Sequence, residues 1–187
     1  MRRLTKIVHN ELAQVLTPGN IAIDATAGNG HDTLFLAKQV GPAGSVFSLD
    51  MQSQALAKTA HRLKEQGYKN VTLLQADHAN LKDVIPIEFH GKIAAITFNL
   101  GYLPGGEKTF VTQSVSTVTA IDQSLDLLRS KGLLTIVAYT GHPGGMEETT
   151  AVRTFLAGVN SPRYTVDEIS TNDERTFSPV LFTILKH

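Results

Sequence analysis

Short apolar runs alternate along this chain with segments whose apolar residues recur every three or four positions. The apolar runs are 21–23, 45–49, 71–74, 93–98, 133–139, 164–169 and 180–185. The periodic segments are 4–16, 31–40, 52–66, 111–128 and 146–158, with a shorter helical stretch in 79–90 that Pro86 interrupts. Strands that alternate with helices are typical of a parallel sheet with crossover helices. The pattern therefore predicts an α/β fold with a seven-stranded, mostly parallel sheet, helices on both faces and a C-terminal antiparallel hairpin.

The long periodic segment at 111–128 carries a more detailed prediction. Lys131-Gly132 follows it and is expected to end the helix, since glycine often follows the last helical residue. One face of this helix is expected to enter the core rather than to hold a cofactor. Its apolar positions are Val111, Val115, Val118, Ile121, Leu125 and Leu128.

Length and composition limit the classes of protein to consider. The chain has 187 residues and 42% hydrophobic residues, which predicts one domain over 1–187, with an N-terminal helix at 1–17 leading into the sheet. The formal net charge is zero, which argues against a protein that coats nucleic acid by bulk electrostatics. There is no cysteine, and this excludes disulfide scaffolds, thiolate zinc sites and cysteine nucleophiles.

Targeting and metal signals are also missing from the sequence. The apolar run 133–139 is far shorter than the ~20 residues that a membrane span needs. The first residues continue into polar sequence without the apolar core of a signal peptide, so a cytoplasmic protein without membrane attachment is expected. No two histidines have the His-x-x-x-His spacing of a helical metal site, and no metal is expected.

A glycine-rich turn follows the first expected strand and is the first candidate binding site. It reads Asp-Ala-Thr-Ala-Gly-Asn-Gly-His-Asp over 24–32. A dinucleotide fingerprint would need a third glycine at position 33, which is threonine, and no phosphate-binding Gly-Lys-Ser/Thr occurs. Glycines there let a ligand approach the backbone, and a side chain in their place would enter ligand space or strain the turn. An acid before Gly-x-Gly offers a carboxylate to a cationic amine and free amides to a carboxylate.

Two further acidic positions follow the next two strands. Asp50 ends the second strand, where a carboxylate can accept hydrogen bonds from ribose hydroxyls. Asp77 and His78 follow the third strand, where an adenine edge would lie. Each feature alone is common in structural turns and helix caps. Three of them at the ends of three successive strands predict a bound nucleoside.

The chain resembles the class I S-adenosylmethionine-dependent methyltransferases over nearly its whole length. More narrowly, three segments are similar to the small bacterial family long labelled putative rRNA methylases. These are the turn 24–33, the segment Asn-Leu-Gly-Tyr-Leu-Pro-Gly-Gly at 99–106, and Tyr-Thr-Gly-His-Pro-Gly-Gly at 139–145. The resemblance implies a Rossmann-like methyltransferase fold, S-adenosylmethionine (AdoMet) as cofactor and S-adenosylhomocysteine as product. The cofactor contacts it implies are Asp24, Thr26, Ala27, Gly28, Asn29, Gly30, Asp32, Asp50, Gln52, Asp77, His78 and Asn99.

Family members are assigned to the wobble uridine of tRNA, and this implies a substrate and a partner. They methylate the amine of 5-aminomethyl-2-thiouridine, so the anticodon region of tRNA is the expected partner. The resemblance is also compatible with a homodimer. Two alternatives stay open at this point. One is a methyltransferase of the same fold that acts on rRNA, a protein or a small metabolite. The other is a nucleotide- or NAD-binding protein, against which Thr33 counts.

The segment after the fourth strand is the expected acceptor site. It is similar to the Asn-Pro-Pro-Tyr motif of amino-methyltransferases but differs at both middle positions. Asn99 is expected to orient the amine, and Tyr102 to stack on the base, both as catalytic residues. The other expected substrate contacts are Leu103, Pro104, Gly105 and His142. The alternative for this segment is a plain exit from the strand with a tyrosine in the core.

Overall fold

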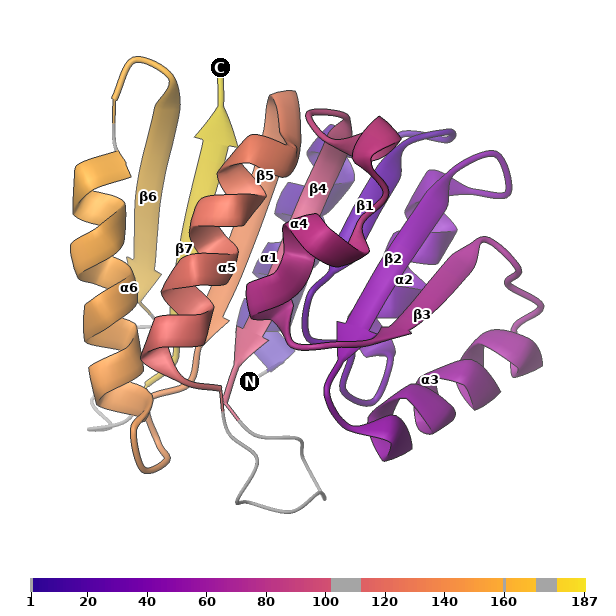
Figure 1. The fold of residues 1–187 in the computed structure, drawn as a ribbon, viewed down its shortest axis with the longest axis horizontal. Helices are drawn as coiled ribbons and strands as arrows, with labels where there is room; N and C mark the ends of the chain where they lie inside the picture. Colours follow the sequence, from indigo (N-terminus) through magenta and orange to yellow (C-terminus); the bar gives the residue numbers. More distant parts are fainter. Residues whose placement is uncertain (1, 102–111, 160, 171–177) are drawn as a thin grey trace.

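The computed structural model describes residues 2–101, 112–159, 161–170 and 178–187 (Figure 1). Within these ranges the chain forms a seven-stranded sheet in the order β3-β2-β1-β4-β5-β7-β6. The strands are β1 (Ile21–Asp24), β2 (Ser45–Asp50), β3 (Val71–Gln75), β4 (Ile93–Leu100), β5 (Leu128–Ala138), β6 (Tyr164–Ser170) and β7 (Val180–Lys186). The α-helices are α1 (Arg2–Val15), α2 (His31–Val40), α3 (Ser53–Glu65), α4 (Leu81–Val84), α5 (Ser114–Leu127) and α6 (Gly145–Val159).

The pairing of the strands fixes where a ligand site can form. β1 lies between β2 and β4 and is parallel to both, while β3 and β5 continue the parallel arrangement on either side. β7 is antiparallel to β5 and to β6, which confirms the expected C-terminal hairpin. The carboxyl ends of β1 to β5 therefore share one edge of the sheet, which we call the carboxyl edge.

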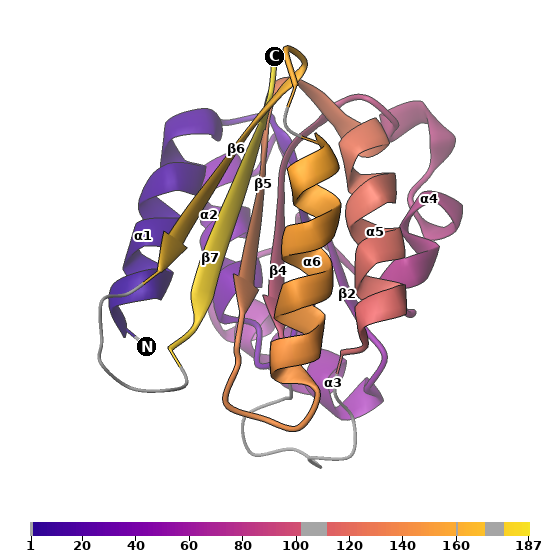
Figure 2. The ribbon, with the colours of Figure 1, turned by 90° about the vertical axis from the view of Figure 1, so that its left-hand side faces the viewer.

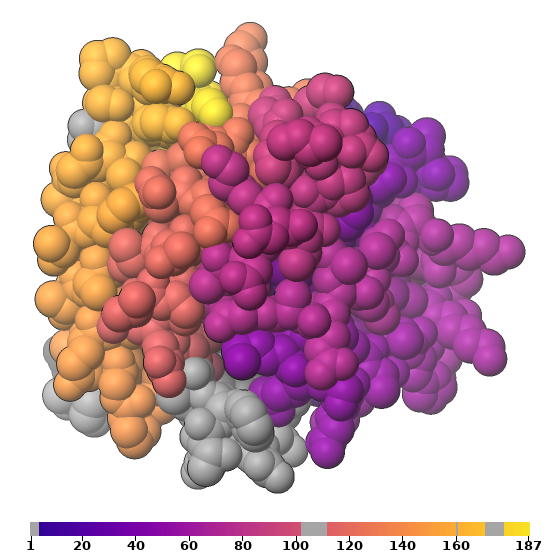
Figure 3. All heavy atoms as spheres, in the orientation of Figure 1, coloured from indigo at the N-terminus to yellow at the C-terminus, as the bar shows by residue number. Residues whose placement is uncertain are grey.

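Helices cover both faces of the sheet, as predicted. Figure 2 shows α1 and α2 on one face and α4, α5 and α6 on the other. Figure 3 shows how the side chains of this second layer close over the strands. Neighbouring residues of a strand enter different cores: Ala22 packs under α1 and α2, whereas Ile23 packs toward α5 and α6. This two-residue alternation explains why the central strands are apolar at nearly every position.

Helix α1 belongs to the core and is not an appendage. Leu4, Val8 and Leu12 recur every four residues, and all three are buried against the sheet. Positions four apart lie on one face of a helix. The residues whose spacing predicted an amphipathic helix are therefore the ones that pack against the sheet. The helix thereby brings its other side chains, His9 among them, to a fixed place beside β4 and β5.

The boundary between α5 and β5 differs from the prediction. The helix ends at Leu127, and Leu128 already pairs with Ile93 of β4. Lys131-Gly132 instead marks an irregularity within β5, where Lys131 has a φ of 60° and the register against β4 shifts. A Cβ on Gly132 would lie 2.8 Å from the carbonyl oxygen of Arg129, so the close approach of the backbone there requires glycine. The helix therefore ends where Leu128 pairs with Ile93, and not at the glycine that the sequence pattern indicated.

The buried face of α5 agrees with the prediction at Ile121 and Leu125, which are buried, but not at Val115, which is 79% exposed. Thr117, Ala120 and Ser124 are also buried. Small polar residues can face the core here because Ser124 donates its hydroxyl hydrogen to the carbonyl of Ala120, and Thr117 donates to a buried carboxylate described below. Val111 lies outside the described residues.

The turn that leaves β1 is built around the carboxylate of Asp24, which is completely buried. One oxygen accepts a hydrogen bond from the amide of Thr26 at 3.2 Å, and the other accepts from the hydroxyl of Thr33 at 2.6 Å. The Thr33 hydroxyl also lies 2.7 Å from that of Ser48 on β2. Burial, and after it the nearby Asp32 carboxylate, raise the pKa of Asp24 to about 7.

The packing of α1 leads to a first prediction. Leu12→Ala should lower the free energy of unfolding by about 2–5 kcal/mol, because it leaves a cavity under the helix. Gln14→Ala, at an exposed position of the same helix, serves as the matched control and should leave stability nearly unchanged. Urea denaturation measures both variants. Equal stabilities would show that α1 is not part of the cooperative fold.

The buried Asp24 leads to a second prediction. Its pKa is raised in the folded chain, so the native state keeps a proton that the unfolded chain has released, and stability should fall as pH rises from about 4 to about 7. The slope should approach about 1.4 kcal/mol per pH unit. Asp24→Asn cannot titrate, so subtracting its unfolding free energy from that of the wild type isolates this contribution. Parallel pH profiles for the two proteins would contradict the assignment.

Candidate active site at the carboxyl edge

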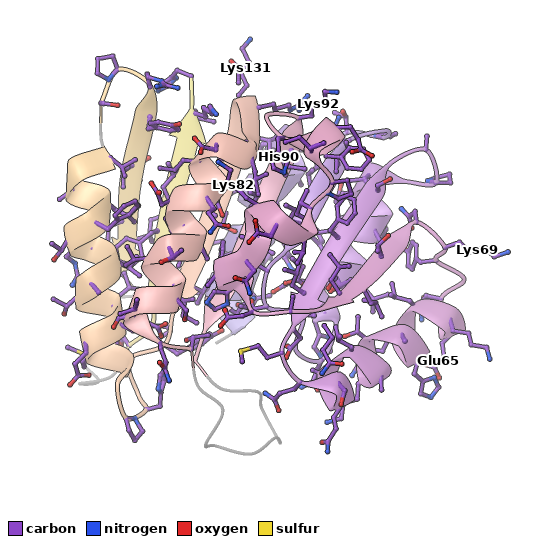
Figure 4. All side chains as sticks on the ribbon, viewed as in Figure 1. Glu65, Lys69, Lys82, His90, Lys92 and Lys131 are labelled. Carbon is purple, nitrogen blue, oxygen red and sulfur yellow. The ribbon has the colours of Figure 1, made fainter. Side chains whose placement is uncertain are left out.

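The loops that leave β1, β2, β3 and β4 bring most of the expected site residues to the carboxyl edge. The prediction that these side chains lie together rested on the parallel sheet, and the strand pairing supports it. Lys92 and Lys131, which are labelled in Figure 4, project from the opposite edge. The side chains that the described loops bring to the carboxyl edge include carboxylates, amides and histidines.

The glycine turn after β1 is held from two sides. The amide of Ala27 donates to the carbonyl of Leu49 at 2.7 Å, which ties the turn to β2. The hydroxyl of Thr59 on α3 donates to the carbonyl of Gly28 at 3.2 Å. Gly28 and Gly30 have φ values of 52° and 80°, a region that favours glycine. The turn is thus a fixed cradle of backbone groups.

Strain of the turn, one of the two expected reasons for glycine, applies at Gly30, where φ is 80°. A Cβ there would lie 2.7 Å from the Thr59 hydroxyl oxygen and 3.0 Å from its Cα, so it would collide with α3 rather than occupy ligand space. Packing between the turn and α3, together with the positive φ, demands glycine. Thr26 and Asn29 are half-buried in the same turn.

Asp50 joins the glycine turn to the end of β2. Its two carboxylate oxygens accept hydrogen bonds from the amide of Gly28 at 2.9 Å and from the amide of Gln52 at 2.8 Å. Each carboxylate oxygen can accept a second hydrogen bond. Asp50 is only half-buried, so a pair of neighbouring hydroxyls could reach it. This geometry fits a ribose, which is the group the sequence predicted here.

Asp77 and His78 lie together after β3. Asp77 accepts a hydrogen bond from the amide of Ala79 at 2.9 Å and begins the 3-10 helix His78–Asn80. His78 is 7% exposed and packs edge-on against Phe98, and its Nε2 is buried without a hydrogen-bond partner. Burial lowers the pKa of His78, although the carboxylates of Asp77, Glu148 and Asp50 oppose the shift. A neutral ring with an unpaired nitrogen fits a ligand that carries nitrogens, such as adenine.

Asn99 is fixed at the end of β4 through its backbone and its side chain. Its backbone amide donates to the hydroxyl of Thr26 at 2.7 Å, and its Nδ2 donates to Oδ2 of Asp32 at 2.7 Å. The other oxygen of Asp32 accepts from Nε2 of His9 at 2.6 Å. Burial alone would raise the pKa of Asp32, but the hydrogen bonds from His9 and Asn99 outweigh it and hold that pKa below its usual value. The charges of His9 and His31 lower the pKa of Asp32 further, and Asp32 therefore keeps its carboxylate ionised at the carboxyl edge.

The end of β4 and the start of α6 enclose a second buried carboxylate. Glu148 accepts hydrogen bonds from the hydroxyl of Thr112 at 2.7 Å and from that of Thr117 at 2.6 Å. Thr112 also exchanges two hydrogen bonds with Gly101, one through its hydroxyl and one through its amide. These contacts join Gly101 and Thr112 to α5 and α6. Tyr102, Leu103, Pro104 and Gly105 lie between these two residues in the sequence and outside the described residues.

His142 lies beside the exit of β4, as expected. Its Nδ1 is 3.0 Å from the carbonyl oxygen of Pro143, and its Nε2 would be 3.4 Å from a Cβ placed on Gly101. Tyr139 is adjacent to the same point, and burial, with a smaller effect from the Asp32 charge, raises the pKa of its hydroxyl. His142 thus borders the predicted acceptor site, and its contact with substrate stays a prediction.

Sequence reasoning missed two members of the site. His9 lies 23 positions before its partner Asp32. The local sequence pattern of α1 does not indicate that this histidine reaches the site. Glu148 has the weak signal of an acid in the first turn of a helix, which by itself indicates only favourable helix electrostatics. Among the described residues no cluster of three His, Asp or Glu side chains could hold a metal ion. No helix in this part of the chain is long and apolar enough to cross a membrane.

Comparison with solved structures places the whole architecture among methyltransferases. A putative rRNA methylase from Clostridium thermocellum superposes with a TM-score of 0.93 and 34% identity, covering 98% of this chain and 97% of that one. A putative methyltransferase from Streptococcus mutans in complex with SAH superposes with a TM-score of 0.87 and 37% identity, covering 98% and 97%. Both likenesses extend over essentially complete chains.

Comparison of sequences agrees with the structural likeness. The chloroplastic tRNA (mnm(5)s(2)U34)-methyltransferase of Arabidopsis thaliana is 36% identical over 167 residues, which are 84% of this chain. The matched region spans 60% of that relative's own length. The family described as putative rRNA methylase matches residues 46–185, from β2 to the last strand. By this match, and by the fold and the carboxyl-edge geometry that accompany it, the chain belongs to the putative rRNA methylase family.

Proposed function

We propose that this chain is an AdoMet-dependent methyltransferase that N-methylates the aminomethyl group of 5-aminomethyl-2-thiouridine at the wobble position of tRNA, giving the 5-methylaminomethyl form. The observation that carries the proposal is the 36% identity to a relative whose name specifies this tRNA position. The solved relative in complex with SAH supports the cofactor. The geometry of Asn99 and Asp32 supports an amine as the acceptor.

The cofactor is proposed to lie across the ends of β1, β2 and β3. Asp50 would accept hydrogen bonds from its ribose hydroxyls, and His78 with Asp77 would meet its adenine. The amides of the glycine turn and the Asp32 carboxylate would hold the carboxylate and ammonium of its methionine part. Asp24 is completely buried, so we propose that it acts by shaping this turn. When bound, AdoMet supplies a methyl group made electrophilic by a sulfonium.

The amine would be held at the end of β4. A primary alkylamine has a pKa near ~10 in water, so the reacting form must first lose its proton. The amine nitrogen then forms a bond to the methyl carbon as the carbon–sulfur bond breaks, and the positive charge passes from sulfur to nitrogen. Asp32 keeps a negative charge beside both positions, so it compensates the positive charge before and after transfer. The product ammonium then releases a proton to water.

A ribosomal RNA substrate is the second candidate. The family description names rRNA, and a ribosomal RNA small subunit methyltransferase H of Alkaliphilus metalliredigens is 33% identical over 96 residues. That match covers 49% of this chain and 27% of the relative. The match to the tRNA methyltransferase is longer and covers 84% of this chain and 60% of that relative. The tRNA substrate is therefore the better supported. Binding to the anticodon region, a homodimer and a cytoplasmic location remain predictions.

A third prediction concerns the cofactor. Asp50→Ala should weaken AdoMet binding about 10- to 150-fold, because a hydrogen bond to a charged acceptor contributes about 1.5–3 kcal/mol. Asp126→Ala is the matched control, since it removes an exposed carboxylate that only pairs with Lys82. Isothermal titration calorimetry with AdoMet measures both variants, and circular dichroism checks their fold. Unchanged affinity in Asp50→Ala would place the ribose elsewhere.

A fourth prediction tests the reaction itself. The wild-type protein should methylate tRNA carrying 5-aminomethyl-2-thiouridine in a single-turnover assay, and Asn99→Ala should slow this step about 100-fold through lost alignment. Mass spectrometry of the nucleosides identifies the product. Tight AdoMet binding without methylation of this tRNA, combined with methylation of ribosomal RNA, would favour the second candidate. The same analysis of tRNA from a strain that lacks the gene would show whether the modification depends on it.

A further inference from the structure

We infer that His9 on α1 is a positioning residue for methyl transfer: by orienting the Asp32 carboxylate it holds the Asn99 amide with Nδ2 toward Asp32 and Oδ1 toward the acceptor amine. This inference rests on the proposed function, since it concerns the same amine. It adds a helix that precedes the sheet to the machinery of the carboxyl edge. The three side chains come from α1, from the first turn of α2 and from the end of β4.

The His9 ring is restrained in two independent ways. It stacks on Phe35 of α2, with ring centroids 3.8 Å apart and an angle of 6° between the planes. Its Nε2 lies 2.6 Å from Oδ1 of Asp32, which is one turn before Phe35 on the same helix. The stacking fixes the plane of the ring, and the hydrogen bond fixes its direction within that plane. Because an ionised carboxylate only accepts, Nε2 is the nitrogen that carries the hydrogen.

Asp32 transmits this restraint to Asn99. With Oδ1 bound to His9, Oδ2 faces β4 and accepts a hydrogen bond from Asn99 at 2.7 Å. A side-chain amide has one donor group and one acceptor group, and the carboxylate can pair only with the donor. The Nδ2 group is therefore held toward Asp32, and Oδ1 occupies the opposite branch of the amide. The backbone of Asn99 cannot swing to compensate, since its amide is bound to the Thr26 hydroxyl.

This orientation matters for the chemistry of an amine. An outward Oδ1 can accept an N–H of the acceptor amine and leave the nitrogen lone pair free to attack the methyl carbon. A reversed amide would instead donate its own N–H to that lone pair, which is the electron pair that must form the new bond. Both orientations would hold the amine, but only the first leaves it reactive. The effect should therefore appear in the rate of transfer and not in the affinity for substrate.

The test compares three variants. His9→Phe keeps the ring stacked on Phe35 but loses the donor, whereas His9→Gln replaces the donor near the position of Nε2. His61→Phe is the control, because His61 is an exposed histidine of α3 with a side chain 73% accessible. His9→Phe should lower kcat about 10- to 100-fold and leave KM for the tRNA and the dissociation constant for AdoMet unchanged. His9→Gln should restore most of the rate, and His61→Phe should equal the wild type. Unfolding midpoints confirm that each protein is folded.

A second readout does not depend on catalysis. In ¹⁵N-labelled protein without cofactor, the side-chain NH₂ resonances of Asn99, assigned by their loss in Asn99→Ala, should shift in His9→Phe and return in His9→Gln. Unmoved resonances, or a rise in KM with an unchanged kcat, would overturn the positioning role. If the resonances shift as expected but wild-type protein does not methylate the tRNA, the coupling of His9 to Asn99 through Asp32 is supported and the proposed substrate is wrong.

Discussion

The structure depends on one buried carboxylate, that of Asp24, and on the groups that satisfy it. The Asp24 carboxylate is shielded from water, so its hydrogen bonds come from the protein: from the backbone amide of Thr26 and the hydroxyl of Thr33. Those two contacts set the path of the turn after β1, and the turn sets where the Gly28 amide meets Asp50. The pKa of Asp24 is raised and that of Asp32 is lowered, so the negative charge resides at the more accessible of the two.

The sequence was sufficient for the features that depend on short stretches of chain. The alternation of apolar runs and helical periodicity predicted the sheet, its two helical layers and the final hairpin, and the structure confirms all three. Asp50 and Asp77 could be placed at the carboxyl edge because Asp50 ends β2 and Asp77 follows shortly after the end of β3, and parallel strands end at the same edge. The resemblance to the family read from the sequence likewise rested on short contiguous segments, at 24–33, 99–106 and 139–145. In each case the information lies within a short stretch of chain.

Contacts between distant segments were beyond this kind of reasoning. Asn99 meets Asp32 across 67 positions and Glu148 meets Thr117 across 31, and no periodicity in either segment indicates the pairing. The end of α5 was predicted wrongly because Leu128 gains a strand partner, Ile93, that lies far back in the chain. The chemical types at the site were therefore readable, whereas their hydrogen-bond partners required the folded chain. For Asn99, the sequence gives the side-chain amide, but only its hydrogen bond to Asp32 shows which way the amide is turned.

The contact between Gly101 and Thr112 has a consequence for how members of this family can diversify. Gly101 and Thr112 hold each other by two hydrogen bonds, and Glu148 fixes Thr112 from below. The two residues that flank 102–111 are therefore held together by contacts of their own. Changes in the length or composition of a segment whose flanking residues are joined in this way are expected to cost the rest of the fold little. The family can then vary this segment while the ends of β4 and α6 keep their positions.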